Sequence, residues 1–128
     1  MSFVKYVIRI YDEIIREKTQ LRSLIKTYIK NLMKPYLLQD DALKELVFKI
    51  PRWEIKDGQI QREFKFSNFI EAFSFMTKIA LICEKYNHHP NWENDYSKVI
   101  IRLSTHDLGG ITNLDQTLAS EINKVFDQ

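Results

Sequence analysis

Three histidines carry the side-chain chemistry that stands out most in this chain of 128 residues. His88 and His89 are adjacent and stand directly before Pro90, whereas His106 lies further along the sequence. Imidazole has an ordinary pKa of about 6.5, so it can donate or accept a proton near neutral pH. The pattern predicts an acid–base site, with a merely polar helix end as the alternative. Because adjacent residues in an extended chain point in opposite directions, we expect His88 and His89 to have different tasks.

An apolar helix is expected to end just before the two adjacent histidines. Ser67 or Asn68 is expected to begin this helix, because both residue types are common helix N-caps. Pro90 cannot continue a helix and favours extended backbone at His89, so the helix is expected to end near Asn87. Both histidines would then lie at the C-terminal end of the helix.

Apolar side chains cover most of the circumference of this helix, which is more than one side of a small sheet can bury. We therefore predict a homodimer or homotetramer, with this helix or the edge of the sheet at the interface. The apolar residues are Phe69, Ala72, Phe73, Phe75, Met76, Ile79, Ala80, Ile82 and Cys83.

A strand is expected over residues 98–105, because apolar residues alternate with other residues there. If the strand kept its register, His106 would share the face that carries Ser104. Gly109-Gly110 predicts a turn after the strand. One face of the strand is expected to be buried, with Val99, Ile101 and Leu103 on it.

A last helix is expected to begin at Thr112, because Asp115 stands three residues further on, at capping spacing. We expect Asp115 to act as a helix cap rather than as a catalyst. The apolar stripe of this helix consists of Leu114, Leu118, Ile122 and Val125.

A short helix and a hairpin are expected before the histidine-bearing segments. Asp40 or Asp41 could cap the helix, Pro51 would end it, and its inward positions are Leu43, Leu46 and Val47. Asp57-Gly58 predicts a type I′ turn between strands over 52–56 and 59–66. That turn sets Ile55 opposite Ile60 and Trp53 opposite Arg62. The order of the elements predicts an α+β fold, in which a four-stranded antiparallel sheet has helices packed on one face.

The N-terminal part of the chain differs in composition from the rest. Residues 1–37 carry a net charge of +5 and residues 38–128 a net charge of −3. Apolar residues between Phe3 and Met33 recur at helical spacing, which predicts an additional amphipathic helix, continuous or broken near Thr19-Gln20. It could pack on the domain or on a neighbouring subunit. Met33 could also be an alternative translation start, which would make this leader dispensable.

A basic surface helix or a targeting presequence is a weaker interpretation of residues 1–37, because Asp12, Glu13 and Glu17 suit neither. The remaining residues form no basic stripe, so direct nucleic-acid binding is not expected. A single cysteine indicates a reducing compartment, and no apolar run is long enough for a bilayer. We expect no membrane association and a cytoplasmic location, extended to the nucleus if the source is eukaryotic.

From about Leu43 to the C-terminus, the sequence resembles the pterin-4a-carbinolamine dehydratases. The most specific stretch runs from Glu84 to Trp92 and contains both adjacent histidines. The other matching pieces are Phe64-Lys65-Phe66, Ala72-Phe73-Ser74-Phe75-Met76-Thr77, Tyr96, Leu103-Ser104-Thr105-His106, Gly110-Ile111-Thr112, Asp115 and Leu118-Ala119. Residues 1 to about 37 lie outside the resemblance.

The resemblance implies an enzyme that removes water from 4a-hydroxytetrahydropterin to give quinonoid dihydropterin, in tetrahydrobiopterin recycling after aromatic amino acid hydroxylation. It implies His88, His89 and His106 as active-site residues, without a metal or a cofactor other than the pterin substrate. We assign His88 and His106 to proton transfer and His89 to pterin orientation. The substrate-binding candidates are Glu84, Asn87, Trp92, Ser104 and Thr105, although Trp92 could instead be a core anchor and Glu84 a solvated partner of a histidine.

Two other functions compete with this one. Three histidines could bind a metal ion, although adjacent histidines rarely converge on one ion and no His-x-His spacing occurs. The chain could also be a non-catalytic dimerisation cofactor in transcription, as family members in animals are.

Overall fold

The structure is a computed structural model that describes residues 3–32 and 34–128. The chain separates into two compact units, Met1–Lys34 and Pro35–Gln128. Met33, considered above as a translation start, lies outside the described residues. The first unit contains one helix, α1 (Phe3–Leu32), with no break at Thr19-Gln20. No helix among the described residues has the length and apolarity needed to cross a bilayer.

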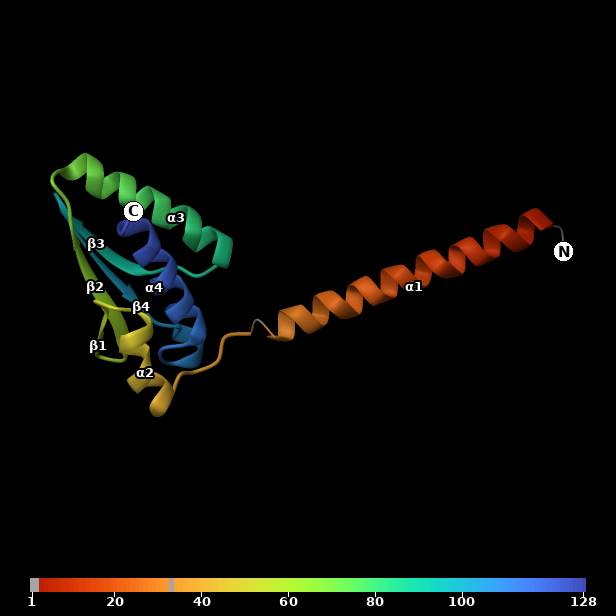
Figure 1. The fold of residues 1–128 in the computed structure, drawn as a ribbon, viewed down its shortest axis with the longest axis horizontal. Coiled ribbons are helices and arrows are strands. Elements are labelled where there is room, and N and C mark those ends of the chain that lie inside the picture. Colours follow the sequence, from red (N-terminus) through yellow and green to blue (C-terminus); the bar gives the residue numbers. More distant parts are fainter. Residues whose placement is uncertain (1–2, 33) are drawn as a thin grey trace. The chain divides into compact units, whose positions relative to one another are not determined.

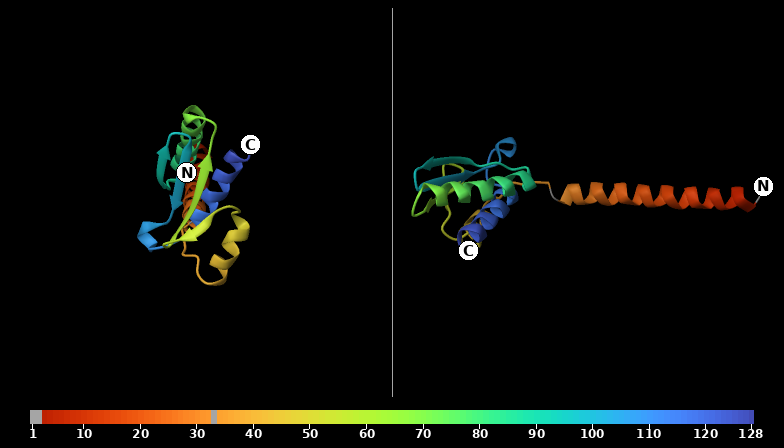
Figure 2. Two further views of the ribbon diagram at one scale, coloured as in Figure 1. Left: turned by 90° about the vertical axis from the view of Figure 1, so that its left-hand side faces the viewer. Right: turned by 90° about the horizontal axis from the view of Figure 1, so that it is seen from above.

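The second unit is the predicted α+β domain. Its elements follow the order α2 (Asp41–Lys49), β1 (Glu54–Lys56), β2 (Gln59–Lys65), α3 (Phe69–Tyr86), β3 (Asn91–Asp95), β4 (Lys98–Leu103), a 3-10 turn (His106–Leu108) and α4 (Asn113–Phe126). The four strands form one antiparallel sheet in the order β1-β2-β4-β3. Figures 1 and 2 show α3 and α4 lying across the same face of this sheet.

The register of the sheet directs one set of side chains toward the helices. Ile60 pairs with Leu103 and Phe64 pairs with Val99, and all four side chains are fully buried. Between β1 and β2, Ile55 pairs with Ile60, as the two-residue turn predicted. Both turn residues have positive φ, 52° at Asp57 and 73° at Gly58, which is the conformation of a type I′ turn.

Two of the predicted local features need correction. In α2, Leu46 is buried but Val47 is exposed, and Asp40 precedes the helix without a capping hydrogen bond from its side chain. The register of β4 does not continue to His106. The strand ends at Leu103, and Thr105 N–H then donates to the carbonyl of Gly110 at 2.8 Å, which turns the chain into the 3-10 turn.

A polar cluster inside the core joins the hairpin to α4. Trp53 Nε1 donates to Asn123 Oδ1 at 2.7 Å, and the buried guanidinium of Arg62 donates to the same oxygen. Arg62 also lies 4.5 Å from the ring centroid of Phe64 and 4.9 Å from that of Phe126. Burial lowers the pKa of Arg62 from its ordinary value. The cluster pairs polar groups that would otherwise be costly to bury.

α3 begins and ends as its sequence predicts. The side chain of Asn68 accepts a hydrogen bond from the backbone N–H of Glu71 at 2.9 Å, and Asn87 ends the helix with φ of 47°. Ala72, Phe75 and Ile79 face the core, whereas Ile70, Phe73 and Leu81 are exposed. The exposed apolar face agrees with the expectation of a covering partner, and a homo-oligomer stays a prediction.

Cys83 on α3 is expected to be unreactive in the folded chain. Burial raises the pKa of its thiol from 9.0 to about 11, so the thiolate at pH 8 is about 100-fold scarcer than in the unfolded chain. Reaction with an aromatic disulfide reagent should be slower by at least that factor than in denaturant. Because the folded pKa is the higher one, the stabilisation is complete below pH 9 and is lost as the pH rises to about 11. Equal rates in the folded and unfolded chain would contradict this account.

A shortened chain that begins at Met33 is expected to remain folded. Among the described residues, the buried apolar core of the second unit runs from Leu38 to Ile122. The melting temperature of the shortened chain should therefore lie within a few degrees, about 5 °C, of that of the full chain, since a surface change costs about 0.5 kcal/mol. Circular dichroism at increasing temperature measures this. A much larger drop would show that α1 stabilises the domain.

Candidate active site

The three histidines line one hollow of about 240 Å³. His88 and His89 come from the segment after α3, and His106 begins the 3-10 turn after β4. The structure therefore brings together imidazoles from two separate segments, as an acid–base site requires. Asn87, Ser104, Thr105 and Asp107 complete the lining.

The end of α3 fixes where His88 and His89 enter the hollow. Asn87 adopts the left-handed conformation, and its N–H and that of His88 donate to carbonyls of the last helical turn, at 3.2 Å to Glu84 and 3.0 Å to Cys83. These bonds satisfy carbonyls that the helix leaves open at its end. Pro90 then prevents any continuation of the helix, and β3 begins at the next residue.

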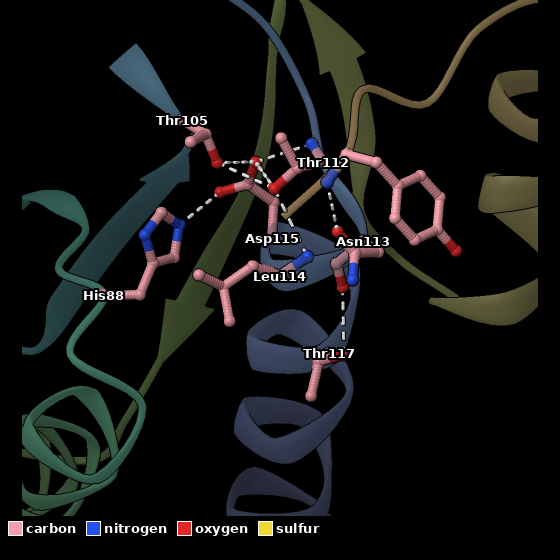
Figure 3. Close-up of polar contacts among 8 residues, drawn as sticks. His88, Thr105, Thr112, Asn113, Leu114, Asp115 and Thr117 are labelled. Atoms are coloured by element: carbon pink, nitrogen blue, oxygen red, sulfur yellow. Dashed lines mark hydrogen bonds and ion pairs between the residues drawn. The ribbon is translucent and has the colours of Figure 1, made fainter. Parts of the chain in front are cut away.

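His88 is held by a buried carboxylate. Its Nε2 lies 2.5 Å from Oδ1 of Asp115, and the side chain of Asp115 is fully buried. The side chain of His88 is only 11% exposed. Because a carboxylate can only accept a hydrogen bond, Nε2 carries the hydrogen and the other ring nitrogen, Nδ1, is left as an acceptor. Figure 3 shows Nδ1 on the side of the ring away from Asp115.

The second oxygen of Asp115 is engaged by the helix cap and by the end of β4. Oδ2 accepts from Thr112 N at 2.8 Å, from Thr105 Oγ1 at 2.9 Å and from Thr112 Oγ1 at 3.2 Å (Figure 3). The predicted capping box at the start of α4 is therefore present. One carboxylate thus both begins α4 and fixes the orientation of the His88 ring.

His89 and His106 are more open to solvent than His88. His89 Nε2 lies 2.6 Å from Oε1 of Glu84, and this pair lies at the surface. Glu84 therefore contacts a histidine, as one of the two interpretations of the sequence expected. His106 is exposed and borders a second hollow of about 310 Å³, which extends past Ser104 and Thr105 to the Asp57-Gly58 turn. The two hollows share Ser104, Thr105 and His106 in their linings.

The remaining candidates fall into two groups. Asn87, Ser104 and Thr105 line the hollow. Trp92 does not belong to its lining and packs from β3 against the core, which was the alternative weighed for it. Its role in substrate binding stays a prediction.

Asp115 is the residue whose contact with the site the sequence did not reveal. Its spacing from Thr112 predicted a helix cap. No neighbouring residue in the sequence indicates that its other oxygen, Oδ1, contacts His88, 27 residues earlier. The signal that could have found it is its place within the pieces that carried the resemblance. Asp107, which was left outside those pieces, also lines the hollow.

Metal ligation was the rival interpretation of the histidines. Across residues 3–32 and 34–128, three or more His, Cys, Asp or Glu side chains nowhere converge in a geometry that could hold an ion. His88 and His89 instead contact separate carboxylates, at Asp115 and Glu84. The arrangement is suited to moving protons between a ligand and fixed imidazoles.

The fold and the site define a small α+β domain in which three histidines, from the ends of α3 and β4, line one hollow. The model of the family described as pterin 4 alpha carbinolamine dehydratase matches residues 36–125. The chain belongs to this family, which confirms the resemblance found in its sequence.

Relatives of this chain occur in Prochlorococcus marinus. A protein of Prochlorococcus marinus (strain MIT 9312) is 84% identical over 96 residues, which are 75% of this chain and all of that protein. A relative from strain NATL2A is 51% identical over 90 residues, 70% of this chain and 95% of its own length. Both are provisionally named pterin-4-alpha-carbinolamine dehydratase. The remaining 32 residues of this chain have no counterpart in the first relative.

A solved structure has the same fold. The crystal structure of a transcriptional coactivator/pterin dehydratase from Brucella melitensis is 36% identical, with a TM-score of 0.69. The match covers 71% of this chain and 99% of that one.

Proposed function

We propose that this chain removes water from 4a-hydroxytetrahydropterin to give quinonoid dihydropterin, by acid–base catalysis with its three histidines. The observation that carries the proposal is the gathering of His88, His89 and His106 around one hollow, in a chain of this family. The names of the relatives from Prochlorococcus marinus support the same reaction.

The reaction requires two proton movements on a flat ring. The bond between C4a and the hydroxyl oxygen breaks, and the oxygen leaves as water once it has received a proton. The hydrogen on N5 leaves as a proton while the C4a–N5 double bond forms, so protons and electrons balance without an oxidant. Positioned acid and base groups typically contribute about 10²- to 10⁴-fold to the rate of such a step.

The geometry supports a division of roles among the histidines. His88 is the base, because Asp115 occupies Nε2 and leaves Nδ1 to accept the proton from N5. His106, in the other segment of the lining, is the acid that protonates the leaving hydroxyl. His89, held by Glu84 at the rim, orients the pterin. Asn87, Ser104 and Thr105 offer polar groups to the ring edge.

The substrate would come from an aromatic amino acid hydroxylase, and the product would be reduced again in tetrahydrobiopterin recycling. Acid–base chemistry of this kind uses side chains alone, so no metal or further cofactor is part of the proposal. Activity should therefore survive extensive chelation.

Stopped-flow absorbance of the freshly generated carbinolamine tests the proposal. The rate of quinonoid formation should rise in proportion to the concentration of the full chain. A rate that equals the uncatalysed one at every protein concentration would overturn the proposal. Loss of activity on chelation, restored by stoichiometric zinc, would replace acid–base catalysis with metal catalysis.

A second candidate function is binding of a protein partner. The Brucella melitensis protein is named a transcriptional coactivator as well as a dehydratase. In this chain, Ile70 and Leu81 on α3 are 75% and 70% exposed, which leaves an apolar surface available to a partner. If His88→Ala and His106→Ala both left carbinolamine dehydration unchanged, this function would take first place.

A further inference from the structure

Helix α1 lies outside the residues that the family model matches, and the proposed reaction does not use it. It is continuous over 30 residues. A helix in a protein owes most of its stability to the packing of its apolar face against another part of the structure. From Phe3 to Tyr28 its large apolar side chains are exposed, among them Tyr11 at 64% and Leu21 at 58%. The helix therefore presents an apolar face that needs a partner.

The apolar residues of α1 follow a repeat of seven. Spacings of three and four alternate from Val4 to Tyr28, with Lys18 as the one charged position, which is the pattern of the a and d positions of a coiled coil. Sustained over at least three heptads, this pattern indicates a coiled coil. The a positions are Val4, Tyr11, Lys18 and Ile25, and the d positions are Val7, Ile14, Leu21 and Tyr28.

The seven-residue repeat can be compared with the apolar line of a straight amphipathic helix. In a straight helix, residues about 18 positions apart, or five turns, lie on one line. Val4 with Arg22 and Ile8 with Lys26 break such a line with a charge, whereas Phe3 with Leu21 and Val7 with Ile25 keep it apolar. A stripe that recurs every seven residues drifts by about 20° per heptad and stays in contact only when the helices wind around each other with a left hand. A lipid surface is the alternative partner that the vesicle experiment below distinguishes from a second copy.

Charges beside the stripe fit a parallel pairing. Glu17 is at a g position and Arg22 is at the e position five residues later, where parallel, in-register helices place opposite charges across the interface. Lys18 is the single charged residue among the a and d positions from Val4 to Tyr28. A lone polar residue at an a position fixes the register of a coiled coil at some cost in stability. The ion pair of Arg9 with Glu13 lies at positions f and c, away from the stripe.

We propose that α1 assembles with α1 of further copies of this chain as a parallel, in-register, left-handed coiled coil. Apolar residues also occupy several flanking e and g positions, such as Ile8, Ile10 and Ile15, so each helix can bury more surface than the narrow seam alone. The assembly would connect several catalytic domains through their leaders. It depends on neither the proposed reaction nor the exposed face of α3.

Cysteine cross-linking of the full chain tests the pairing and its direction. Val7→Cys and Leu21→Cys place a thiol at d positions, which meet their own counterparts within disulfide reach only if the helices are parallel and in register. Ser23→Cys, at an outward f position two residues from Leu21, is the matched control. The native Cys83 is buried and should not interfere. Under mild oxidation, both d variants should form linked dimers at least tenfold faster than the control.

Charge reversal gives a second, independent readout. In the Val7→Cys background, Glu17→Arg or Arg22→Glu alone should lower the linking rate several-fold, and the two together should restore it. Equal linking rates in the two d variants and the control variant would overturn the proposal, as would linking of Leu21→Cys but not of Val7→Cys. Co-sedimentation of the unlinked full chain with phosphatidylglycerol vesicles, without linking at d positions, would replace the second copy with a lipid surface.

Discussion

Replacing His88 with glutamine is expected to lower kcat for carbinolamine dehydration by about 10²- to 10⁴-fold, the usual contribution of a general base. A glutamine amide can still donate a hydrogen bond to Asp115 Oδ1 in place of Nε2, so the carboxylate keeps its partner. The variant loses the second ring nitrogen, which is the group proposed to accept the proton from N5. Stopped-flow kinetics of the variant and the wild-type chain measure the loss, and the melting temperature verifies that the fold is intact.

His89→Gln is the matched control for this substitution. His89 contacts Glu84 at the surface and is proposed to orient the pterin, so its loss should raise KM a few-fold, by about 1 kcal/mol of binding, and leave kcat nearly unchanged. If the two glutamine variants lowered kcat by the same factor, the separate roles assigned to the adjacent histidines would be wrong. A fully active His88→Gln chain would remove His88 from the catalytic machinery.

Asp115→Asn is expected to lower both stability and activity. The buried carboxylate of Asp115 accepts hydrogen bonds from His88, Thr105 and Thr112, whereas an asparagine offers one acceptor oxygen and turns an NH₂ group toward donors. Unsatisfied buried groups and a damaged cap should cost about 2 to 4 kcal/mol. For a domain of this size, the melting temperature should fall by roughly 10 to 30 °C. Thermal denaturation followed by circular dichroism measures the fall.

The activity of the Asp115→Asn variant separates the effect on the orientation of the His88 ring from the effect on the stability of the fold. At a temperature where the variant is fully folded, kcat should still be lower by about tenfold or more, because the His88 ring is no longer held. Thr112→Val is the control, since it removes one hydrogen bond to Oδ2 and leaves the contact of Oδ1 with His88. It should lose about 1 kcal/mol of stability and little kcat. If both variants lost kcat equally, the contact with His88 would not explain the effect.

Local signals predicted the elements of this domain well. Asp57-Gly58 is flanked by residues that pair as a hairpin, Asn68 and Thr112 cap their helices, and Asn87 ends α3. Each of these features depends on residues within about four positions of one another, so sequence patterns record them.

Contacts between segments far apart in the chain could not be predicted from the sequence. The alternation of the hairpin placed Arg62 opposite Trp53, but it could not show that both side chains meet Asn123 of α4. Likewise, the spacing of Thr112 and Asp115 predicted a helix cap. Only the packing of α4 against the end of α3 brings Oδ1 of Asp115 to His88. The strand predicted over 98–105 ends at Leu103, and the backbone N–H of Thr105 donates to the carbonyl of Gly110 instead.

Asp115 caps α4 with one carboxylate oxygen and holds the His88 ring with the other. This arrangement has a consequence for heat inactivation. Helix ends fray before helix centres, and local opening costs less than global unfolding. When the first turn of α4 opens, the carboxylate leaves, and the imidazole that depends on it is released while the sheet and α3 are still assembled. Molecules in which this turn is open would be inactive although the rest of the domain is folded, and their activity would return when the turn closes. The catalytic rate would thus report the fraction of molecules in which the first turn of α4 is closed.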